Sequence, residues 1–474
     1  MSPHIAILLF VGFIFWIVRR DSKEATGVSH ALWVPVIWVG IDASRPVGYW
    51  FNSTSVATDP LAAMEGSPFD RNVYLALIIL GIIILVRRRI DWSSIIKLNR
   101  ALIIFHLYLL ISVLWSDYPL VSFKRWVKDF GTVVMILIVL TEGNPYNAIK
   151  RIFSMCTYAL IPLSLLFVKY YSEIGRYYDR YEGHAYYCGI TMNKNALGVL
   201  AMVSGIFLIW RLSVIWKLMP SRQRSIGILA NAVVLVMCIW LLDIARSATS
   251  IACFAIATTV FIASHFKWMQ TNIRQIAFYA GSLTLLSLII LITPDLRELV
   301  VKSLGRDVTL TGRTVIWDMV LSRNTNPLIG TGFGAFWVGP DAVQISQNWA
   351  LTEAHNGYLE TYLNSGLIGV VLLFGVLFSA GKNAIRHLAT GTGLGNFYLA
   401  LFLSGIIYNY TEATFNVSHI MGFCLWLIAF RITPIQEPAL GDGGEIADTS
   451  RALLQTATFD SGHVCFKSLA RAMF

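Results

Sequence analysis

Charged residues are scarce in this sequence. Only 14% of the 474 residues are charged, whereas 56% are hydrophobic, and the mean hydropathy is +0.63. Soluble domains contain about 25% charged residues on average. This composition excludes an ordinary soluble domain and predicts a polytopic membrane protein.

Paired cysteines and common catalytic motifs are also missing. The six cysteines show no paired spacing, and only Cys188 is expected in an exposed loop, so neither a disulfide framework nor a zinc site is predicted. No DxD or ExD pair, HExxH motif, Walker loop or GxSxG elbow occurs in a suitable context. The sequence therefore disfavours an ATPase and a metal-dependent nucleotide-sugar transferase, and we expect no metal and no cofactor.

Long apolar runs are abundant instead. A helix needs about 20 largely apolar residues to cross a bilayer, and by this measure the chain contains about 12–13 spans. We expect an all-α, polytopic transmembrane bundle with one large loop that carries short helices. The first run is expected to be retained, because two arginines rather than a small-residue cleavage site follow it. The predicted spans lie near residues 3–18, 31–50, 71–86, 100–116, 126–141, 152–169, 195–212, 226–242, 247–264, 275–293, 362–380, 395–410 and 416–431.

Basic residues fall mostly on one side of these spans. The dense Lys and Arg clusters share one face, which the positive-inside rule assigns to the cytoplasm. The opposite, outer face receives the large loop, residues 294–361. We divide the chain into N-terminal transmembrane helices (1–99), a membrane domain (100–431) and a disordered cytoplasmic tail (432–474).

Several cations remain on the predicted outer face, where topology does not require them. They either extend to lipid phosphates or converge on an anionic group at the membrane interface. These cations are Arg45, Lys124, Arg125, Arg176, Arg180, Lys194, Arg246 and Arg313.

Two of these arginines are candidate phosphate ligands. Arg246 lies in a tight turn between two apolar runs, where it either pairs with Asp243 or binds phosphate through its planar guanidinium. Arg313 follows Gly312 and begins an amphipathic stretch with helical spacing. The free N–H groups of a first helical turn favour an anion, so we prefer anion binding to a role as a surface arginine.

One histidine precedes the last outer-to-inner helical run. His355 lies in EAHNGYLETYLNSGLIG, with Glu353 and Glu360 close enough in sequence to orient its ring. A lone histidine is more often structural, but imidazole is the side chain best suited to proton transfer near neutral pH. The position of His355 near the mouth of the bundle, on the face with unexplained cations, favours a catalytic role.

A tyrosine-rich loop lies on the same predicted face. Seven tyrosines occur between Tyr170 and Tyr187, interleaved with charged residues and with His184. Tyrosines are common in interfacial aromatic belts. Stacking against sugar rings is the alternative, and the sequence leaves both interpretations open.

The segments around these residues resemble the O-antigen ligase and polymerase superfamily, membrane glycosyltransferases with a Wzy-C domain. The paired GR…NPLIGTGFG and HNGYLE…GLIG segments carry most of the resemblance, which covers about residues 100–430. The N-terminal ALWVPVIWVGIDASRPVGYW resembles the exopolysaccharide-polymerase-like branch. Further matching segments are WSDYPLVSFKR (115–125), MNKNALG (192–198) and ARSATS (245–250).

The resemblance implies a bundle in a bacterial inner membrane, with the active site and the loop 294–361 facing the periplasm. It implies a donor oligosaccharide on undecaprenyl diphosphate, a glycan acceptor, and metal-independent transfer with inversion. Contacts with membrane lipids and other polysaccharide-assembly proteins are also implied, and none with nucleic acid.

Family analogy also assigns roles to residues. Arg246 and Arg313 would bind the lipid diphosphate and His355 would serve the acceptor hydroxyl. MNKN stands where a histidine-lysine-asparagine variant is expected, so either His184 or no residue fills that place. The other substrate-binding candidates are Lys124, Arg125, Arg45, Lys194 and Glu360.

Three functions remain open on these residues. A polymerase transfers the growing chain to another lipid-linked unit, whereas a ligase transfers it to lipid A core or to protein; the N-terminal segment favours a polymerase. A polysaccharide transporter or flippase would show inverted repeats with broken spans, and the sequence shows no matching pair. Whether His355 acts as a base or only orients the acceptor is also open.

Overall fold

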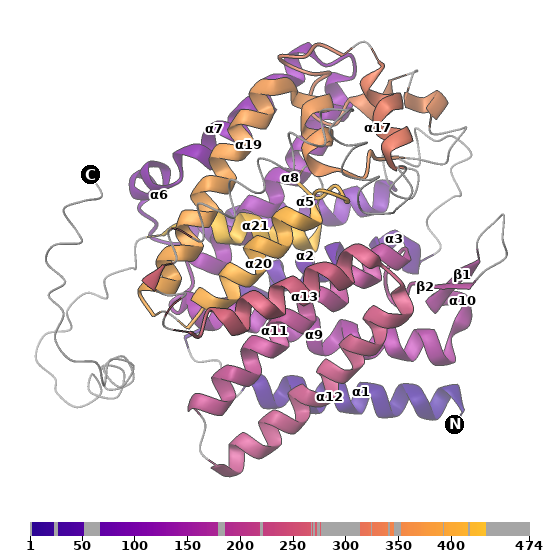
Figure 1. The fold of residues 1–474 in the computed structure, drawn as a ribbon, viewed down its shortest axis with the longest axis vertical. Helices are drawn as coiled ribbons and strands as arrows, with labels where there is room; N and C mark the ends of the chain where they lie inside the picture. The colour runs from indigo at the N-terminus through magenta and orange to yellow at the C-terminus, as the bar shows by residue number, and fades with distance from the viewer. Residues whose placement is uncertain are drawn as a thin grey trace, which may run out of the picture. The chain divides into compact units, whose positions relative to one another are not determined.

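The described part of the chain is almost entirely helical in the computed structural model (Figure 1). This confirms the predicted all-α, polytopic class. A two-stranded antiparallel sheet of β1 (Arg176–Tyr178) and β2 (Ala185–Tyr187) is an exception. The structure describes residues 2–22, 27–51, 67–178, 185–218, 221–266, 268, 271–272, 275, 313–323, 325–339, 342–345, 352–391, 393–415 and 418–432.

The described helices follow the chain in two sets. The first set is α1 (Pro3–Ser22), η1 (His30–Leu32), α2 (Trp33–Asp42), α3 (Val47–Trp50), α5 (Pro68–Arg87), α6 (Trp92–Leu98), α7 (Arg100–Ile111), η2 (Ser112–Trp115), α8 (Pro119–Leu140), α9 (Pro145–Tyr170) and α10 (Ser172–Gly175). The second set is α11 (Lys194–Leu218), α12 (Ser221–Ala245), α13 (Ala248–Ala263), α17 (Arg313–Leu321), η3 (Phe336–Val338), α19 (Gly357–Ala389), α20 (Gly395–Tyr408) and α21 (Ile420–Ala429).

Within the described residues, fewer helices than the predicted 12–13 are long and apolar enough to cross a membrane. Five described helices are long and apolar enough, namely α5, α9, α11, α12 and α19, and the bent pair of α6 with residues 100–115 would make a sixth. Four predicted spans form shorter apolar helices, at 30–42, 248–263, 395–408 and 420–429. The predicted span 126–141 is only the apolar part of α8, whose first half carries four charged residues. The predicted span 275–293, apart from residue 275, lies outside the described residues.

Burial separates the inside of the bundle from its apolar outside. All ten residues of α21 are buried, and α21 lies beside α20, which in turn packs against α13 (Figure 1). By contrast, α1, α5 and α12 expose large apolar side chains such as Leu8, Leu80 and Val236. Exposed apolar side chains cost little against lipid tails, which are as apolar as leucine. These helices therefore present lipid-facing surfaces.

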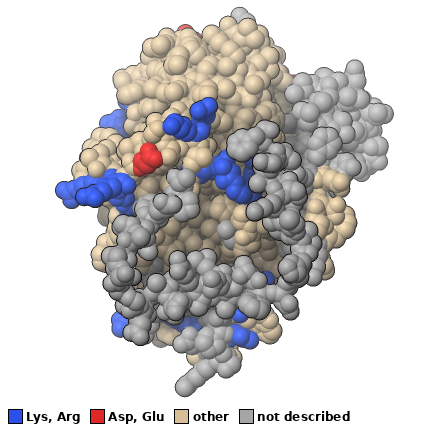
Figure 2. Space-filling view, turned by 90° about the vertical axis from the view of Figure 1, so that its left-hand side faces the viewer, with Lys and Arg blue, Asp and Glu red and all other residues tan. Residues whose placement is uncertain are grey.

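Several Lys and Arg side chains lie on the left-hand side of the molecule in Figure 1. Figure 2 views the molecule from the left of Figure 1 and shows them among few Asp or Glu side chains of the described residues. Basic last turns end α1, with Arg19 and Arg20, α5, with Arg87, and α19, with Arg386. An excess of basic residues on one side is the distribution that the positive-inside rule describes.

A break in α19 joins the two segments that carried the sequence resemblance. Gly366 has φ +63°, a left-handed conformation that glycine adopts without steric cost. A side chain here would lie 2.2 Å from the backbone of Leu328. Across the break, Leu367 N–H donates to Pro327 O at 2.9 Å and Thr331 N–H to Leu363 O at 3.0 Å. The NPLIGTGFG segment is therefore hydrogen-bonded into the interrupted turn of α19.

Candidate functional site

A single acid links the segments that the sequence set apart. The carboxylate of Glu412, in the loop between α20 and α21, accepts from Arg313 Nη2 at 2.8 Å and from Asn195 Nδ2 at 3.1 Å. His355 Nδ1 lies 3.4 Å from its other oxygen. These contacts join the first turn of α17, the first turn of α11 and the residues just before α19. We call Glu353, His355, Glu412 and Arg313 the ionic cluster.

Backbone contacts fix the ionic cluster in place. Gly357 N–H donates to Asn409 O at 2.8 Å and to Glu412 O at 3.0 Å, so the first residue of α19 docks on the loop that carries Glu412. Trp317 Nε1 donates to Ala354 O at 2.8 Å and ties α17 to the residue before His355. A packed helix and a docked loop thus hold Arg313 and His355 on opposite sides of one carboxylate.

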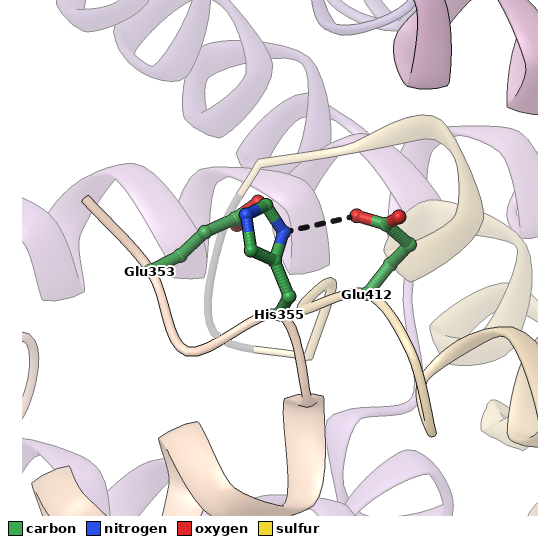
Figure 3. Close-up of side chains that lie close together, drawn as sticks. All are labelled: Glu353, His355 and Glu412. Atoms are coloured by element: carbon green, nitrogen blue, oxygen red, sulfur yellow. Dashed lines mark hydrogen bonds and ion pairs between the residues drawn. The ribbon is translucent and has the colours of Figure 1, made fainter. Parts of the chain in front are cut away.

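The imidazole of His355 lies between two carboxylates (Figure 3). Its Nδ1 is 2.9 Å from Glu353 Oε1 and 3.4 Å from Glu412 Oε2. Glu353 therefore stands where the sequence expected it, beside the ring. With Nδ1 engaged by carboxylates, Nε2 is the ring atom left for a substrate proton.

Both carboxylates favour the protonated ring. Burial lowers the pKa of His355, but the hydrogen bonds and negative charges of Glu353 and Glu412 outweigh burial and raise this pKa from 6.5 to about 9. Near neutral pH the ring is therefore mostly imidazolium in the absence of substrate. A neutral ring formed there would be a stronger base than an ordinary histidine.

Two non-glycine residues of the described chain have positive φ, and both are sequence-predicted catalytic residues. They are Arg246 and His355, each with φ 49°. A left-handed conformation costs a non-glycine residue roughly 1–2 kcal/mol. Such strain persists where the surroundings enforce it and is concentrated at functional sites. The backbone therefore supports the choice of these two positions independently of their side chains.

The ionic cluster also has the donor types of a cation site. One ligand atom each from Glu353, His355 and Glu412 lie within 4.8 Å of one another. Arg313, however, already places a positive charge 2.8 Å from Glu412. A divalent ion would have to displace the His355 proton and tolerate this guanidinium. The donor set therefore fits a bound proton better than a metal.

A pocket adjoins the turn that contains Arg246. It has a volume of about 460 Å³. Arg246 and Asp243 are both exposed, and within the described residues their side chains form no ion pair with each other, contrary to one of the two sequence interpretations. We call this cavity the Arg246 pocket; Tyr187, Asp243, Ile244, Arg246, Ala248 and Ile251 line it.

The Arg246 pocket is connected to the ionic cluster through the start of α13. Thr249 Oγ1 lies 2.8 Å from Thr411 Oγ1, in the residue next to Glu412. Gly198, one turn into α11, approaches Ser247 and Ser250 so closely that a side chain at this position would lie 2.7 Å from Ser250 Oγ. The ARSATS and MNKNALG segments therefore pack together at the site.

Glu360 does not orient the His355 ring, which corrects that expectation. It is buried in the first turn of α19 and accepts from Trp337 Nε1 at 2.7 Å and from Ala354 N–H at 2.6 Å. Asn364 Nδ2 also donates to it at 3.2 Å. These contacts hold η3 and the residue before His355, so Glu360 is placed to position the loop rather than to meet substrate.

Arg45 likewise makes structural contacts. It is buried, and its guanidinium donates to the carbonyls of Thr191, Ile174 and Gly189 and to the sulfur of Cys188. Its donors are therefore directed at α10 and at residues 188–191. Cys188 is itself buried, so the expectation of an exposed cysteine was wrong.

The remaining predicted substrate-binding residues fall into different surroundings. Arg125 donates to Gly334 O and joins α8 to the NPLIGTGFG segment, and Lys124 lies half-buried beside it. Lys194, at the start of α11, lies with its Nζ 4.1 Å from the centre of the Tyr186 ring. His184 lies outside the described residues.

Glu412 was missed in the sequence. It lies in YNYTEATFN, a polar interruption between the last two apolar runs, and 57 residues separate it from His355. An acid in an otherwise uncharged break was the available signal. The predicted spans placed Glu412 between two apolar runs, but they did not predict that this polar interruption contacts His355 and Arg313.

This combination of fold and site defines a polytopic helical membrane protein with a strained, ion-paired centre at the ends of its helices. A family model described as O-antigen ligase matches residues 223–374. The exopolysaccharide production protein ExoQ of Rhizobium meliloti (strain 1021) is 25% identical over 296 residues, which are 60% of this chain and 65% of the relative, just under two thirds of its length. These matches confirm the resemblance to the O-antigen ligase and polymerase superfamily, in its exopolysaccharide-like branch.

Proposed function

We propose that the protein is a membrane glycosyltransferase of exopolysaccharide or O-antigen synthesis. It would polymerise oligosaccharide repeat units carried on undecaprenyl diphosphate, at the periplasmic face of a bacterial inner membrane. The observation that carries this proposal is the ionic cluster, in which one carboxylate joins an arginine suited to phosphate and a histidine suited to a hydroxyl proton. The name of the relative, an exopolysaccharide production protein, supports the same process.

The arginines would serve the donor. When the bond between the anomeric carbon and the phosphate oxygen breaks, the leaving diphosphate gains negative charge. Arg313 uses Nη2 on Glu412 and keeps further N–H donors for a phosphate oxygen. Arg246 supplies an exposed guanidinium at the adjoining pocket. Together they would stabilise the leaving group without a divalent ion.

His355 would serve the acceptor. The acceptor hydroxyl oxygen attacks the anomeric carbon from the side opposite the phosphate, which inverts the configuration. The ring would first lose its Nε2 proton to solvent, and the hydroxyl proton would then pass to Nε2 of the neutral ring as the new bond forms, while Nδ1 stays hydrogen-bonded to Glu353 and Glu412. The two carboxylates stabilise the imidazolium that results.

A ligase is the second candidate. The matching family model is described as O-antigen ligase, and a ligase would use the same arginines on the same donor diphosphate. It would differ in its acceptor, which would be lipid A core or a protein. The site residues serve both reactions, so the products must distinguish them.

The test is replacement of His355 and Arg313 by alanine, singly, in the producing bacterium. Loss of one oxyanion-stabilising group typically costs about 100- to 1000-fold in rate. A polymerase defect leaves single lipid-linked repeat units, and a ligase defect leaves full-length lipid-linked polymer. Arg71→Ala, which removes an exposed arginine from the first turn of α5, is the matched control. Normal glycans in both site variants would contradict the enzymatic assignment.

A further inference from the structure

The proposed use of Arg246 leaves two residues of its pocket unexplained. Tyr187 and Asp243 also line this cavity, and neither is needed to hold a diphosphate. Its volume of about 460 Å³ lies within the range of small-molecule sites, roughly 300–1,000 Å³. The cavity has room for more than the phosphate group that Arg246 would bind.

Tyr187 is fixed in its position at the pocket. The guanidinium carbon of Arg176 lies 5.3 Å from the centre of the Tyr187 ring, and Arg176 is itself held by Val168 O at 2.9 and 3.1 Å. The pairing of β1 with β2 places Arg176 directly opposite Tyr187. A ring held this way is a rigid aromatic surface, and binding against it costs little side-chain entropy.

The two-stranded sheet also relates this pocket to the ionic cluster. Side chains alternate between the faces of a strand, so Tyr186 lies on the face opposite Tyr187. There its ring contacts Lys194, whose neighbour Asn195 donates to Glu412. One face of the sheet therefore adjoins the Arg246 pocket, and the other lies beside the residues that reach the ionic cluster.

Asp243 gives the pocket a hydrogen-bond acceptor. It is exposed, and within the described residues its side chain has no hydrogen-bond or ion-pair partner. A free carboxylate accepts hydrogen bonds from hydroxyl groups. The pocket thus combines an aromatic face, a carboxylate and a guanidinium, which suit a neutral sugar linked to a phosphate.

We propose that the Arg246 pocket binds the first pyranose of the lipid-linked donor, a neutral sugar, directly beside the diphosphate. The ring of Tyr187 would lie against the C–H face of the sugar, and Asp243 would accept hydrogen bonds from its hydroxyls. This inference rests on the proposed function, because it takes the diphosphate at Arg246 as given.

Two probes and a set of single-residue variants test the proposed sugar site. The probes are the undecaprenyl-diphosphate-linked repeat unit from the producing bacterium and undecaprenyl diphosphate without sugar, each titrated into the purified full-length protein in nanodiscs. Tyr187→Leu should weaken binding of the glycosylated probe about 3- to 10-fold and leave the bare diphosphate lipid unchanged. Tyr187→Phe should retain both affinities. Tyr178→Leu, a change in an exposed tyrosine of the same sheet that does not line the pocket, is the control.

The results distinguish failure of the sugar site from failure of the donor site. Equal affinity of Tyr187→Leu and wild type for the glycosylated probe would overturn the sugar site, and so would an equal loss for both probes. Asp243→Asn, at an exposed position, should lower affinity for the glycosylated probe alone and carries the test if Tyr187→Leu does not fold. Unchanged binding of both probes by Arg246→Ala would overturn the proposed donor site instead.

Discussion

Replacing Glu353 with glutamine should lower the pKa of His355. Glu353 supplies the shorter of the two carboxylate contacts to Nδ1, 2.9 Å against 3.4 Å from Glu412. The rise of this pKa from 6.5 to about 9 corresponds to about 3 kcal/mol of preference for the charged ring, at about 1.4 kcal/mol per tenfold change. The Glu353 side chain is 37% exposed, so solvent screens its charge. We therefore expect Glu353→Gln to lower the pKa by about one unit and Glu412→Gln to lower it as well.

The pH dependence of kcat/KM with the lipid-linked repeat unit measures this pKa in the free protein. If the neutral ring accepts the hydroxyl proton, the rate rises with pH and levels off above about 9 in the wild type. In Glu353→Gln the plateau should begin about one pH unit lower. A rate that falls above about 9 would instead mean that the imidazolium itself is required.

The same pKa makes folding stability depend on pH. A group whose pKa is raised in the folded state stabilises the fold below its unfolded pKa, here about 6.5, and this contribution is lost as pH rises through about 9. Thermal unfolding temperature should therefore fall across this window, and fall less in Glu353→Gln. Glu173→Gln, which removes an exposed acid from α10, is the control. The reasoning would be refuted if the pH profile of kcat/KM in both Glu353→Gln and Glu412→Gln had its inflection at the same pH as in the wild type.

The remaining predictions concern strain, packing and metal ions. Arg246→Gly should relieve the strain of the left-handed backbone and raise the stability measured by thermal unfolding by up to about 1 kcal/mol. The rate of glycan transfer should fall about 100-fold or more, because the guanidinium is lost. A variant that is both less stable and fully active would contradict this prediction. Gly366→Ala should lower the free energy of unfolding by more than about 3 kcal/mol, because its methyl group would lie 2.2 Å from the Leu328 backbone. The amount of folded protein measured by size-exclusion chromatography should therefore drop. A yield equal to that of the wild type would disprove the close packing. Dialysis against a chelator should leave the initial transfer rate within twofold, and restoration of a lost rate by one divalent ion would show that the ionic cluster holds a metal.

The helical class and one partner of His355, Glu353, could be predicted from sequence because their signals are local. Apolar runs predict helices, and Glu353 lies two residues from His355. Glu412 could not be predicted, since its contact with His355 depends on how α19 docks against the loop after α20. Glu360 shows the opposite error: it is near His355 in sequence, but the first turn of α19 directs it to Trp337.

Fewer described helices than predicted spans are long enough to cross a membrane, for a physical reason of the same kind. An apolar run states that a segment prefers to be buried, but burial against protein and burial against lipid give the same composition. The helix α21 has only ten residues, and all are buried inside the described bundle. Its apolar sequence reflects contact with neighbouring helices as much as any contact with the membrane. Arg45 was misjudged similarly, because a cation at a predicted interface can bind backbone carbonyls instead of a ligand.

The carboxylate of Glu412 has a consequence for the order in which substrates bind. Arg313 donates to one of its oxygens at 2.8 Å, and His355 Nδ1 lies 3.4 Å from the other. A donor diphosphate that attracts Arg313 would leave more of this negative charge to His355 and so increase its affinity for a proton. Donor binding would then change the proton affinity of His355 before the acceptor arrives. Kinetics with the donor bound first, and acceptor affinity that depends on donor occupancy, are what one shared carboxylate predicts.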